Sequence, residues 1–337
     1  MEKLPSISIV IPTLNCENLL KKCLESIENQ DYPKNKIEII IADRGSKDNT
    51  LKIARKYTSK IFSNPLKTAE AGKAVGVKKA KNDLIAFIDS DNILPEKDWI
   101  KKMVKPFEDD EIIGSEPLYY TYRKTDPITT RYFALLGMND PLCLFIGNYD
   151  RYCYITGKWT EMKVKEEDQG DYLKVELNEK QLPTIGANGF MIRRKFLKNF
   201  KDDFLFDIDL VYELVKNGKN KFAKVKVGII HIFSSNLSVF VKKQERRIRD
   251  YEYYKNLNLR KYNWTSMNNT KLLKFVISTL LIFPLLLQVI KGFLRKQTKV
   301  WFIHPLACWL TLIIYGDNVI MSKFSKKSIM NRDILTK

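Results

Sequence analysis

The 337-residue chain is long enough for one large domain or a domain with an appendage, and 45% of its residues are apolar, so we expect a sizeable core. Its five cysteines are few, odd in number and irregularly spaced, which argues against a disulfide framework, and with only two histidines a structural zinc site is not expected. The formal net charge of +19 indicates an anionic partner: nucleic acid, a membrane surface or a phosphorylated substrate.

The first third of the chain alternates strand and helix signals, which predicts an α/β domain. Residues 6–11 form a β-branched run that we expect to end at Pro12, and apolar residues then recur at helical spacing over 19–27. Two more strands are expected at 37–41 and 84–88. Because these strands are apolar throughout, they predict a mostly parallel central sheet flanked by helices on both faces.

The middle of the chain has a different character. Residues 115–185 are rich in aromatic and turn residues with weak periodicity, so we expect a long insertion with short elements rather than a separate domain. Regular signals then return, with a helix over 206–218, a strand over 222–230 and a charged helix after Leu237.

The C-terminal part combines basic and apolar residues. Basic residues crowd over 242–261, and apolar stretches follow at 275–290 and 300–315. Each stretch is about 16 residues, or roughly 24 Å as a helix, against ~30 Å of bilayer hydrocarbon. The link between them is basic, so two spanning helices would conflict with the positive-inside tendency. A transmembrane hairpin, a re-entrant or in-plane pair, and core helices of a soluble domain all stay open, and membrane contact is favoured.

Asp89 and Asp91 directly follow the strand at 84–88. Residues i and i+2 of a strand share a face, and ligands of open α/β sheets bind beyond the carboxyl ends of the strands. Two carboxylates at that position suit Mg2+ or Mn2+, which in turn binds phosphates. The alternative is that the pair only caps the next helix.

Two further strand ends carry polar groups. Asp43 ends the second strand, where a carboxylate can accept hydrogen bonds from a base or a ribose, although it also suits an ordinary turn. Pro12, Thr13 and Asn15 end the first strand, and their short polar groups and backbone amides suit a nucleotide. A strand-to-helix turn capped by Asn15 is the alternative.

Together the segments SISIVIPTLN at 6–15, DRGSKDNT at 43–50 and FIDSD at 87–91 resemble the family-two glycosyltransferases, which have the nucleotide-sugar-binding fold called GT-A. The resemblance covers residues 5–115 and returns over 184–250. It implies that these residues bind the nucleotide sugar: Pro12, Thr13, Asn15, Asp43, Lys73, Asp89 and Asp91. It also implies a divalent metal, Mg2+ or Mn2+, held by Asp91, Asp89 and His231. His231 ends the strand at 222–230, where contact with the diphosphate and a purely structural role are the alternatives.

The second part of the resemblance concerns the acceptor. The segment that contains Gly186, Asn188 and Gly189 resembles the acceptor-side segment of the family, where glycines permit close backbone approach. In the helix at 206–218, Asp207 aligns with the general base, and Asp209 is its competitor.

The segment QERRI at 244–248 resembles the Gln-x-x-Arg-Trp motif of processive polysaccharide synthases, but Ile248 replaces the tryptophan, which argues against a processive synthase. We expect Arg246 and Arg247 to face donor phosphates or lipid phosphates instead.

The resemblance thus implies an inverting, metal-dependent glycosyltransferase that uses a nucleotide-diphosphate sugar. We expect a GT-A domain over 1–262, in which 115–185 shapes the acceptor region, and membrane-associated helices over 263–337. The expected acceptor is a lipid-linked glycan, at the cell membrane with the catalytic domain in the cytoplasm, with an anionic membrane surface and no nucleic acid as partner. A polyprenyl-phosphate sugar synthase and a non-catalytic membrane scaffold with a nucleotide-sugar fold are the alternatives.

Overall fold

The computed structural model describes residues 4–262 and 269–324. The chain divides into two compact units. The first holds the residues up to Tyr122 together with Met162–Ile232, and the second holds Arg123–Glu161 together with the residues from Phe233 onward. Residues 233–262 therefore belong to the second unit, and the domain boundary expected after residue 262 stays a prediction.

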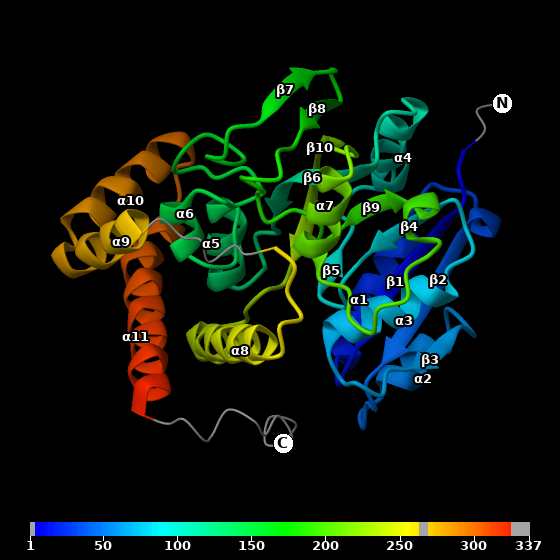
Figure 1. The fold of residues 1–337 in the computed structure, drawn as a ribbon, viewed down its shortest axis with the longest axis horizontal. Coiled ribbons are helices and arrows are strands. Elements are labelled where there is room, and N and C mark those ends of the chain that lie inside the picture. Colours follow the sequence, from blue (N-terminus) through cyan, green and yellow to red (C-terminus); the bar gives the residue numbers. More distant parts are fainter. Residues whose placement is uncertain (1–3, 263–268, 325–337) are drawn as a thin grey trace. The chain divides into compact units, whose positions relative to one another are not determined.

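The first unit is built on one mixed sheet, which has ten strands in the described part of the chain (Figure 1). The strand order is β3-β2-β1-β4-β9-β6-β10-β8-β7, and β5 pairs with β10. The N-terminal strands are mutually parallel: β1 (Ile7–Thr13), β2 (Ile37–Asp43), β3 (Ile61–Ser63) and β4 (Leu84–Phe87). The sequence predicts β1, β2 and β4, whereas the short strand β3 was not expected. The sheet as a whole is mixed because β9 (Phe190–Arg193) runs antiparallel to both β4 and β6.

The other strands come from distant parts of the sequence. They are β5 (Asn92–Ile93), β6 (Gly114–Thr121), β7 (Lys165–Asp168), β8 (Tyr172–Glu176) and β10 (Lys221–His231). β6 pairs in parallel with β10, and its first five residues are all buried. The expected insertion therefore starts with a strand of the core. Because this strand is buried on both faces, it lacks the alternation of polar and apolar residues that would have indicated a strand in the sequence.

The expected end of the first strand at Pro12 is wrong, because β1 continues to Thr13. Pro12 pairs with Ala42 of β2 in the parallel register. The pairing of β1 with β4 stops at Val10, so no ladder partner on that side needs the backbone N–H that proline lacks. Both Pro12 and Thr13 are buried in the sheet.

The helices of the first unit are α1 (Glu17–Glu28), α2 (Thr50–Ala54), α3 (Ala69–Lys79), α4 (Trp99–Val104) and α7 (Asp207–Lys216), with short 3-10 helices at Lys34–Lys36, Lys105–Glu108 and Arg194–Leu197. α3 packs on β1 and β2. A Cβ at Gly76 would lie 2.1 Å from the side chain of Val10, and one at Gly72 would lie 3.0 Å from Pro12. These two glycines let α3 lie close to β1, and Lys73 stands between them.

The second unit is helical in its described residues (Figure 1). Its helices are α5 (Ile128–Leu136), α6 (Leu142–Ile146), α8 (Leu237–Asn256), α9 (Asn269–Leu281), α10 (Phe283–Arg295) and α11 (Ile303–Phe324), with a 3-10 helix at Lys299–Phe302. The apolar stretch expected as one helix over 275–290 is broken, because α9 and α10 meet at 93°. Ile282 at the break has a φ of 59°, and Pro284 follows it at the start of α10.

Among the described residues, the helical segment Lys299–Asn318 is long and apolar enough to cross a membrane, with a mean hydropathy of 1.3. The bent pair α9–α10 meets the same criterion only when its two arms are taken together. α11 also packs inside the second unit. Nδ1 of His304 accepts a hydrogen bond from the Tyr132 hydroxyl (2.7 Å), and its Nε2 donates one to Gln288 Oε1 (2.7 Å).

Candidate functional site

The carboxyl ends of β1 and β2 bring Thr13 beside Asp43, because the parallel register pairs these two residues. The Asp43 carboxylate is 6% exposed and accepts four hydrogen bonds. Thr13 Oγ1 and Ser46 Oγ donate to Oδ1 at 2.8 and 2.6 Å, and the N–H groups of Gly45 and Ser46 both donate to Oδ2 at 2.8 Å. Asp43 therefore orders the turn after β2, and its expected contact with a base or a ribose stays a prediction.

Asn15 connects this turn to the one after β1. Its Oδ1 accepts from the backbone N–H of Lys47 (2.8 Å), and its own N–H donates to Ser46 Oγ (2.9 Å). Asn15 has a φ of 43°, a conformation that asparagine adopts more readily than most residues. Thr13, Asn15 and Asp43 therefore lie together at one edge of the sheet, as the sequence predicts.

Asp89 and Asp91 lie at the same edge, after β4. β5 follows at once and pairs antiparallel with the end of β10, which sets Asn92 opposite His231. As a result His231 Nε2 lies 3.4 Å from Asp91 Oδ2. Two of the three residues expected on the metal are thus brought together from positions far apart in the sequence.

The donor set at this point suits a hard or borderline divalent cation. No group of three or more His, Cys, Asp or Glu side chains among the described residues is arranged to hold a metal on its own. Asp91 and His231 offer one oxygen and one nitrogen ligand. Magnesium is commonly bound through one or two carboxylates plus substrate phosphates and water, so these residues fit a metal that binds jointly with a diphosphate.

A buried amide network joins the metal candidates to the segment expected on the acceptor side. Asn92 Oδ1 accepts from the N–H of Asp89 (3.0 Å), and Asn92 Nδ2 donates to Asn188 Oδ1 (3.0 Å). Asn188 Nδ2 in turn donates to the hydroxyl of Tyr120 (3.0 Å), whose ring lies 5.7 Å from that of His231. Sequence analysis singled out neither Asn92 nor Tyr120, because their role depends on contacts that no local motif indicates.

The acceptor-side segment has an unusual backbone. Gly186, Asn188 and Gly189 have φ angles of 119°, 47° and 92°. The N–H of Gly186 donates to Glu116 Oε1 at 2.9 Å. Glu116 and Lys224 form an ion pair of 2.5 Å in which both side chains are fully buried. The shape of the segment is thus fixed from the core by β6 and β10.

Gly186 also lies against the start of α7. A Cβ at this position would lie 2.9 Å from the carbonyl oxygen of Asp207 and 3.0 Å from its Cβ. The close contact between Gly186 and Asp207 therefore connects the acceptor-side segment to the candidate base.

We expect Gly186→Ala to lower the midpoint of thermal unfolding clearly more than Gly170→Ala. Both positions have positive φ, at 119° and 79°, so each substitution costs about 1 kcal/mol or more in backbone strain. Nothing lies within 4 Å of a Cβ at Gly170, whereas the one at Gly186 meets Asp207. Calorimetry of the two variants checks this. An equal fall in the unfolding midpoint would mean that Asp207 can shift to accommodate the added Cβ at little energetic cost.

Asp207 is the first residue of α7, and both of its oxygens accept from Lys73 Nζ at 2.7 Å. The Lys73 side chain is 6% exposed and that of Asp207 25%. Asp209, the competing candidate, is buried at 4% exposure. Of these two carboxylates Asp207 is the more accessible to a ligand.

Burial raises the pKa of Asp207 to about 6, a rise that Lys73 partly offsets and Asp89 reinforces. Burial also opposes the charge on Lys73, but the carboxylates of Asp207 and Asp89 outweigh it and raise the pKa of the lysine. Lys73, Asp89 and Asp207 therefore form one electrostatic cluster. In this structure Lys73 contacts the candidate base, and its expected contact with a nucleotide stays a prediction.

The sequence profile of Glycosyl transferase family 2 matches residues 8–201, which is more than half of the chain and contains most of this site. The chain belongs to glycosyl transferase family 2. The resemblance seen in the sequence is thus confirmed at the level of the family. The α/β fold with its mixed sheet is GT-A-like, as expected for this family 2 chain.

Individual relatives match only part of the chain. Glycosyltransferase AglE of Haloferax volcanii is 27% identical over 143 residues, 40% of this chain and 46% of the relative. A dolichyl N-acetyl-alpha-D-glucosaminyl phosphate 3-beta-D-2,3-diacetamido-2,3-dideoxy-beta-D-glucuronosyltransferase of Methanococcus voltae is 34% identical over 109 residues, 30% of this chain and 34% of the relative. The alignments thus span less than half of these curated relatives.

Among solved structures, the mannosyltransferase PcManGT from Pyrobaculum calidifontis, in complex with GDP-Man and Mn2+, has a TM-score of 0.51 to this family 2 chain. The match covers 93% of this chain and 87% of the other, at 12% sequence identity. At that identity the likeness concerns the fold alone.

Arg246 and Arg247 lie on α8, in the second unit of this family 2 protein. Arg246 is exposed. Arg247 donates to the carbonyl oxygen of Asn139 (3.0 Å) and to Gln244 Oε1, and lies 3.3 Å from Asp140 Oδ2. Arg247 is therefore engaged inside its own unit, and the expected phosphate contacts of both arginines stay predictions.

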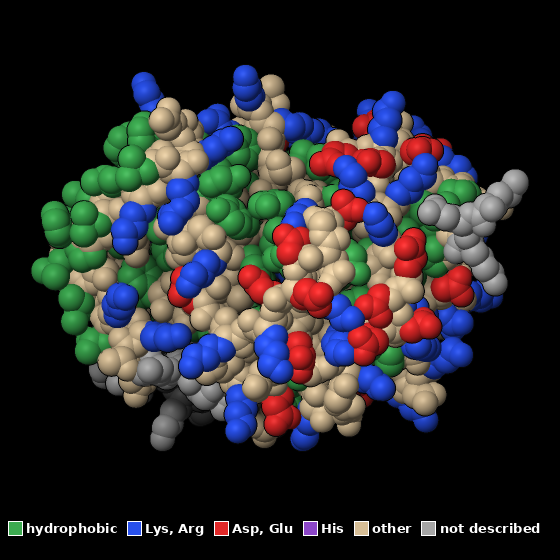
Figure 2. All heavy atoms as spheres, turned by 90° about the horizontal axis from the view of Figure 1, so that it is seen from above, with side chains coloured by type: hydrophobic (Ala, Val, Ile, Leu, Met, Phe, Trp, Pro, Cys, Tyr) green, Lys and Arg blue, Asp and Glu red, His purple; other side chains and the backbone are tan. Residues whose placement is uncertain are grey.

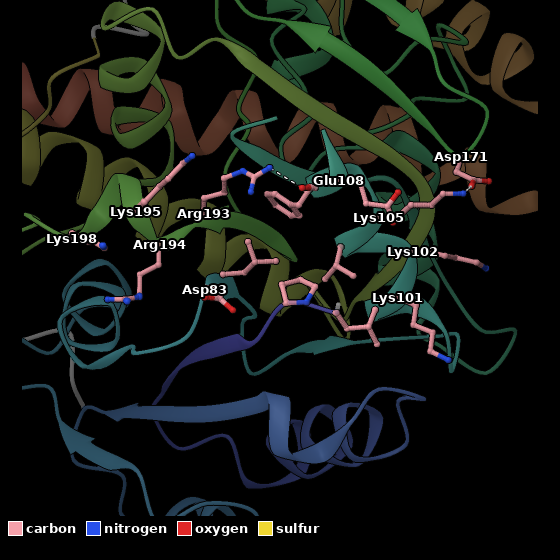
Figure 3. Close-up of a pocket in the computed structure, with 15 residues that line it drawn as sticks. Asp83, Lys101, Lys102, Lys105, Glu108, Asp171, Arg193, Arg194, Lys195 and Lys198 are labelled. Carbon is pink, nitrogen blue, oxygen red and sulfur yellow. Dashed lines mark hydrogen bonds and ion pairs between the residues drawn. The ribbon is translucent and has the colours of Figure 1, made fainter. Parts of the chain in front are cut away.

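An open cavity of about 1310 Å³ lies at the opposite edge of the sheet, by the amino ends of β1 and β4 (Figure 3). Lysine and arginine side chains dominate its lining, but they are largely engaged. Lys101 pairs with Asp31 and Lys102 with Glu96, both at 2.5 Å, and Arg193 donates to backbone carbonyl oxygens. The cavity contains none of the candidate site residues, so its size does not make it the donor site of this family 2 chain.

Proposed function

We propose that this chain is an inverting, metal-dependent glycosyltransferase that moves a sugar from a nucleotide-diphosphate donor to a lipid-linked glycan at the cytoplasmic face of the cell membrane. The observation that carries the proposal is the convergence of Asp43, Asp91 and His231 with Asp207 and its lysine in one compact unit of a family 2 chain. The carboxyl ends of parallel strands are where open α/β sheets bind ligands.

In this proposal Asp43, Thr13 and Asn15 bind the nucleoside at the ends of β1 and β2. Asp91 and His231, with Asp89 beside them, would hold Mg2+ or Mn2+, which neutralises charge on the leaving diphosphate when bound. The Mn2+ and GDP-Man in the solved mannosyltransferase support a metal and a nucleotide sugar for this fold.

Asp207 would take the proton of the acceptor hydroxyl as that oxygen attacks the anomeric carbon. The bond from the anomeric carbon to the donor phosphate breaks on the opposite face, and its electron pair leaves with the nucleoside diphosphate. A single displacement inverts the configuration of that carbon. A pKa of about 6 suits a base near neutral pH, because the carboxylate is then ionised yet still a useful proton acceptor.

The acceptor is inferred from chemistry. The Methanococcus relative is named for action on a dolichyl phosphate sugar, which supports a lipid-linked acceptor. A bare polyprenyl phosphate already carries an anionic oxygen and needs no base, so the Lys73–Asp207 pair favours a sugar hydroxyl. Synthesis of a polyprenyl-phosphate sugar is the second candidate function, and a non-catalytic scaffold is the third.

The decisive assay measures release of nucleoside diphosphate by purified chain from a panel of UDP-, GDP- and dTDP-sugars, with Mg2+, Mn2+ or EDTA and with or without membrane lipid extract. Release from one donor that needs metal and rises with lipid extract is expected. The product's anomeric configuration, read by NMR, checks the inversion. Donor binding without release under every condition would favour the scaffold.

We expect Lys73→Met to move the acidic limb of the pH profile of kcat/KM to higher pH. Asp207 must be ionised to act, so activity should fall as pH drops through about 6, and loss of the neighbouring ammonium raises the pKa of Asp207 further. Lys73→Arg keeps the charge and should keep the limb near its original pH. Lys78→Met, on the same helix but 36% exposed, is the matched control. A higher KM for the donor with an unmoved limb would favour the nucleotide-binding role of Lys73.

A further inference from the structure

The second unit carries a concentrated apolar surface. Of the eighteen large hydrophobic side chains exposed in the described part of the chain, twelve lie between Leu272 and Leu294, on α9, α10 and their junction. Exposure is high at the junction itself, with Leu281 at 65% and Phe283 at 65%. Figure 2 shows hydrophobic side chains gathered over the part of the second unit that bears these two helices. Such patches mark contact with a membrane or a partner.

We propose that the junction of α9 and α10, here called the elbow (residues 280–287), inserts into one leaflet of an anionic membrane, and that the two helices lie in its interface without crossing it. This deepens the membrane contact in the proposed function and names its structural element. It rests on the proposed function in one respect, namely that the sugar acceptor is held in the same membrane.

The length of the two arms argues against crossing. α9 and α10 have 13 residues each, about 20 Å as helices, against ~30 Å of hydrocarbon. They meet at 93°, so the pair cannot act as one straight span. A bent pair of this length fits the headgroup and upper acyl region, where in-plane amphipathic helices lie.

The charges are distributed as an in-plane pair requires. Residues 269–316 contain six lysines and arginines and not one aspartate or glutamate. None of the six lies in the elbow: Lys271 and Lys274 are on the outer part of α9, and Lys291 and Arg295 are on the outer part of α10. The apolar elbow thus lies between two basic flanks, and this charge favours lipids with anionic headgroups.

The outer ends of both arms are fixed to the second unit, whereas six of the eight elbow residues are exposed and only Leu285 is fully buried. Lys271 Nζ donates to the carbonyl oxygen of Ile146 (2.6 Å). Arg295 donates to the carbonyl oxygens of Tyr154 (3.2 Å) and Ile155 (2.6 Å). These anchors hold the arms apart and present the elbow outward from the unit, as a rigid wedge rather than a loose tail.

The longer helix α11 is already packed in the unit. It buries Ala307, Cys308 and Thr311, and its His304 is bonded to Tyr132 and Gln288. If α11 faced lipid on all sides, the His304 imidazole would lose both of these hydrogen-bond partners. Among the described residues of this unit, the elbow therefore exposes more large apolar side chains to a leaflet than α11 does.

The test uses the full-length chain and vesicles of equal parts phosphatidylcholine and phosphatidylglycerol, scored by co-flotation. Phe283→Glu should reduce the bound fraction at least tenfold, and Ile128→Glu should leave it unchanged, because Ile128 is 50% exposed but lies on α5. Vesicles of phosphatidylcholine alone should bind more weakly than the anionic ones. Equal flotation of Phe283→Glu and the unchanged chain would overturn the proposal.

Topology is read by labelling with a maleimide that cannot cross the bilayer, in a chain whose two part-exposed cysteines are changed by Cys16→Ser and Cys143→Ser. Cysteines introduced as Lys274→Cys and Lys296→Cys should both react from outside, and Phe283→Cys should be protected only when vesicles are present. Protection of one arm end but not the other would show a crossing pair and overturn the in-plane arrangement.

Release of nucleoside diphosphate, measured in the same variants without vesicles, distinguishes a loss of catalysis from a loss of membrane binding. Phe283→Glu should release it at the rate of the unchanged chain. Normal release with lost flotation supports the elbow, whereas normal flotation without release in any variant would refute the proposed catalysis and leave the elbow intact.

Discussion

Asp207→Asn is expected to lower kcat for transfer about 100- to 10,000-fold, the usual contribution of a general base. The substituted amide cannot accept the proton of an acceptor hydroxyl. Binding of the nucleotide sugar, measured by calorimetry, should change little, because none of the candidate donor and metal residues lies on α7: Asp43 ends β2, Asp89 and Asp91 lie between β4 and β5, and His231 ends β10. Asp203→Asn is the matched control, since Asp203 precedes the same helix but is 74% exposed.

Asp207→Asn also removes one partner of a largely buried ion pair, so a loss of activity alone would be ambiguous. An uncompensated Lys73 is expected to destabilise the fold by up to about 3 kcal/mol. The double variant Asp207→Asn with Lys73→Met removes both charges and should recover most of that stability without recovering activity. Restored transfer in the double variant would mean that Asp207 matters only as the partner of Lys73.

Asp91→Asn should lower kcat about 1000-fold and weaken Mn2+ binding in the presence of nucleoside diphosphate. Several kcal/mol of charge stabilisation by a metal corresponds to a loss of that size. The substitution replaces the carboxylate that lies 3.4 Å from His231 Nε2 with a neutral amide, which is a weaker ligand. Electron paramagnetic resonance of free Mn2+ gives a readout that does not depend on turnover.

The matched control is Asp98→Asn, because Asp98 is a surface carboxylate 49% exposed and paired with Lys102. It should leave both Mn2+ binding and kcat unchanged. If Asp91→Asn kept the metal dependence of the unchanged chain, Asp91 would not be a metal ligand and Asp89 would become the better candidate.

Local patterns were sufficient to predict β1, β2 and β4 and the candidate residues at their ends, but not the three-residue strand β3. Asp43 and Asp91 follow apolar runs that mark buried strands, and parallel pairing then brings the ends together. Asp207 was found through a motif at a helix start, which the structure confirms as the first residue of α7. Each of these predictions needed only a short stretch of sequence.

The rest depends on contacts across long separations. Lys73 reaches Asp207 over 134 positions in the sequence, and Asn92 reaches Asn188 over 96. No periodicity or motif indicates such pairs. The break at Ile282 was also missed, because the composition of the apolar stretch shows Pro284 but not the positive φ of Ile282, two residues before it. The sequence was therefore sufficient to predict the candidate carboxylates, but not the long-range hydrogen bonds and ion pairs that fix their positions.

The buried ion pair that holds Gly186 limits how the segment 186–189, which we propose faces the acceptor, could be transplanted between relatives. A chimera that received only residues 186–189 would carry the loop without Glu116 and Lys224, which come from β6 and β10. In a host with apolar residues at those two positions, the amide of Gly186 would lose its acceptor and the loop its shape. Successful loop swaps should therefore include both strands, and β6 and β10 should diverge in step with the loop they support.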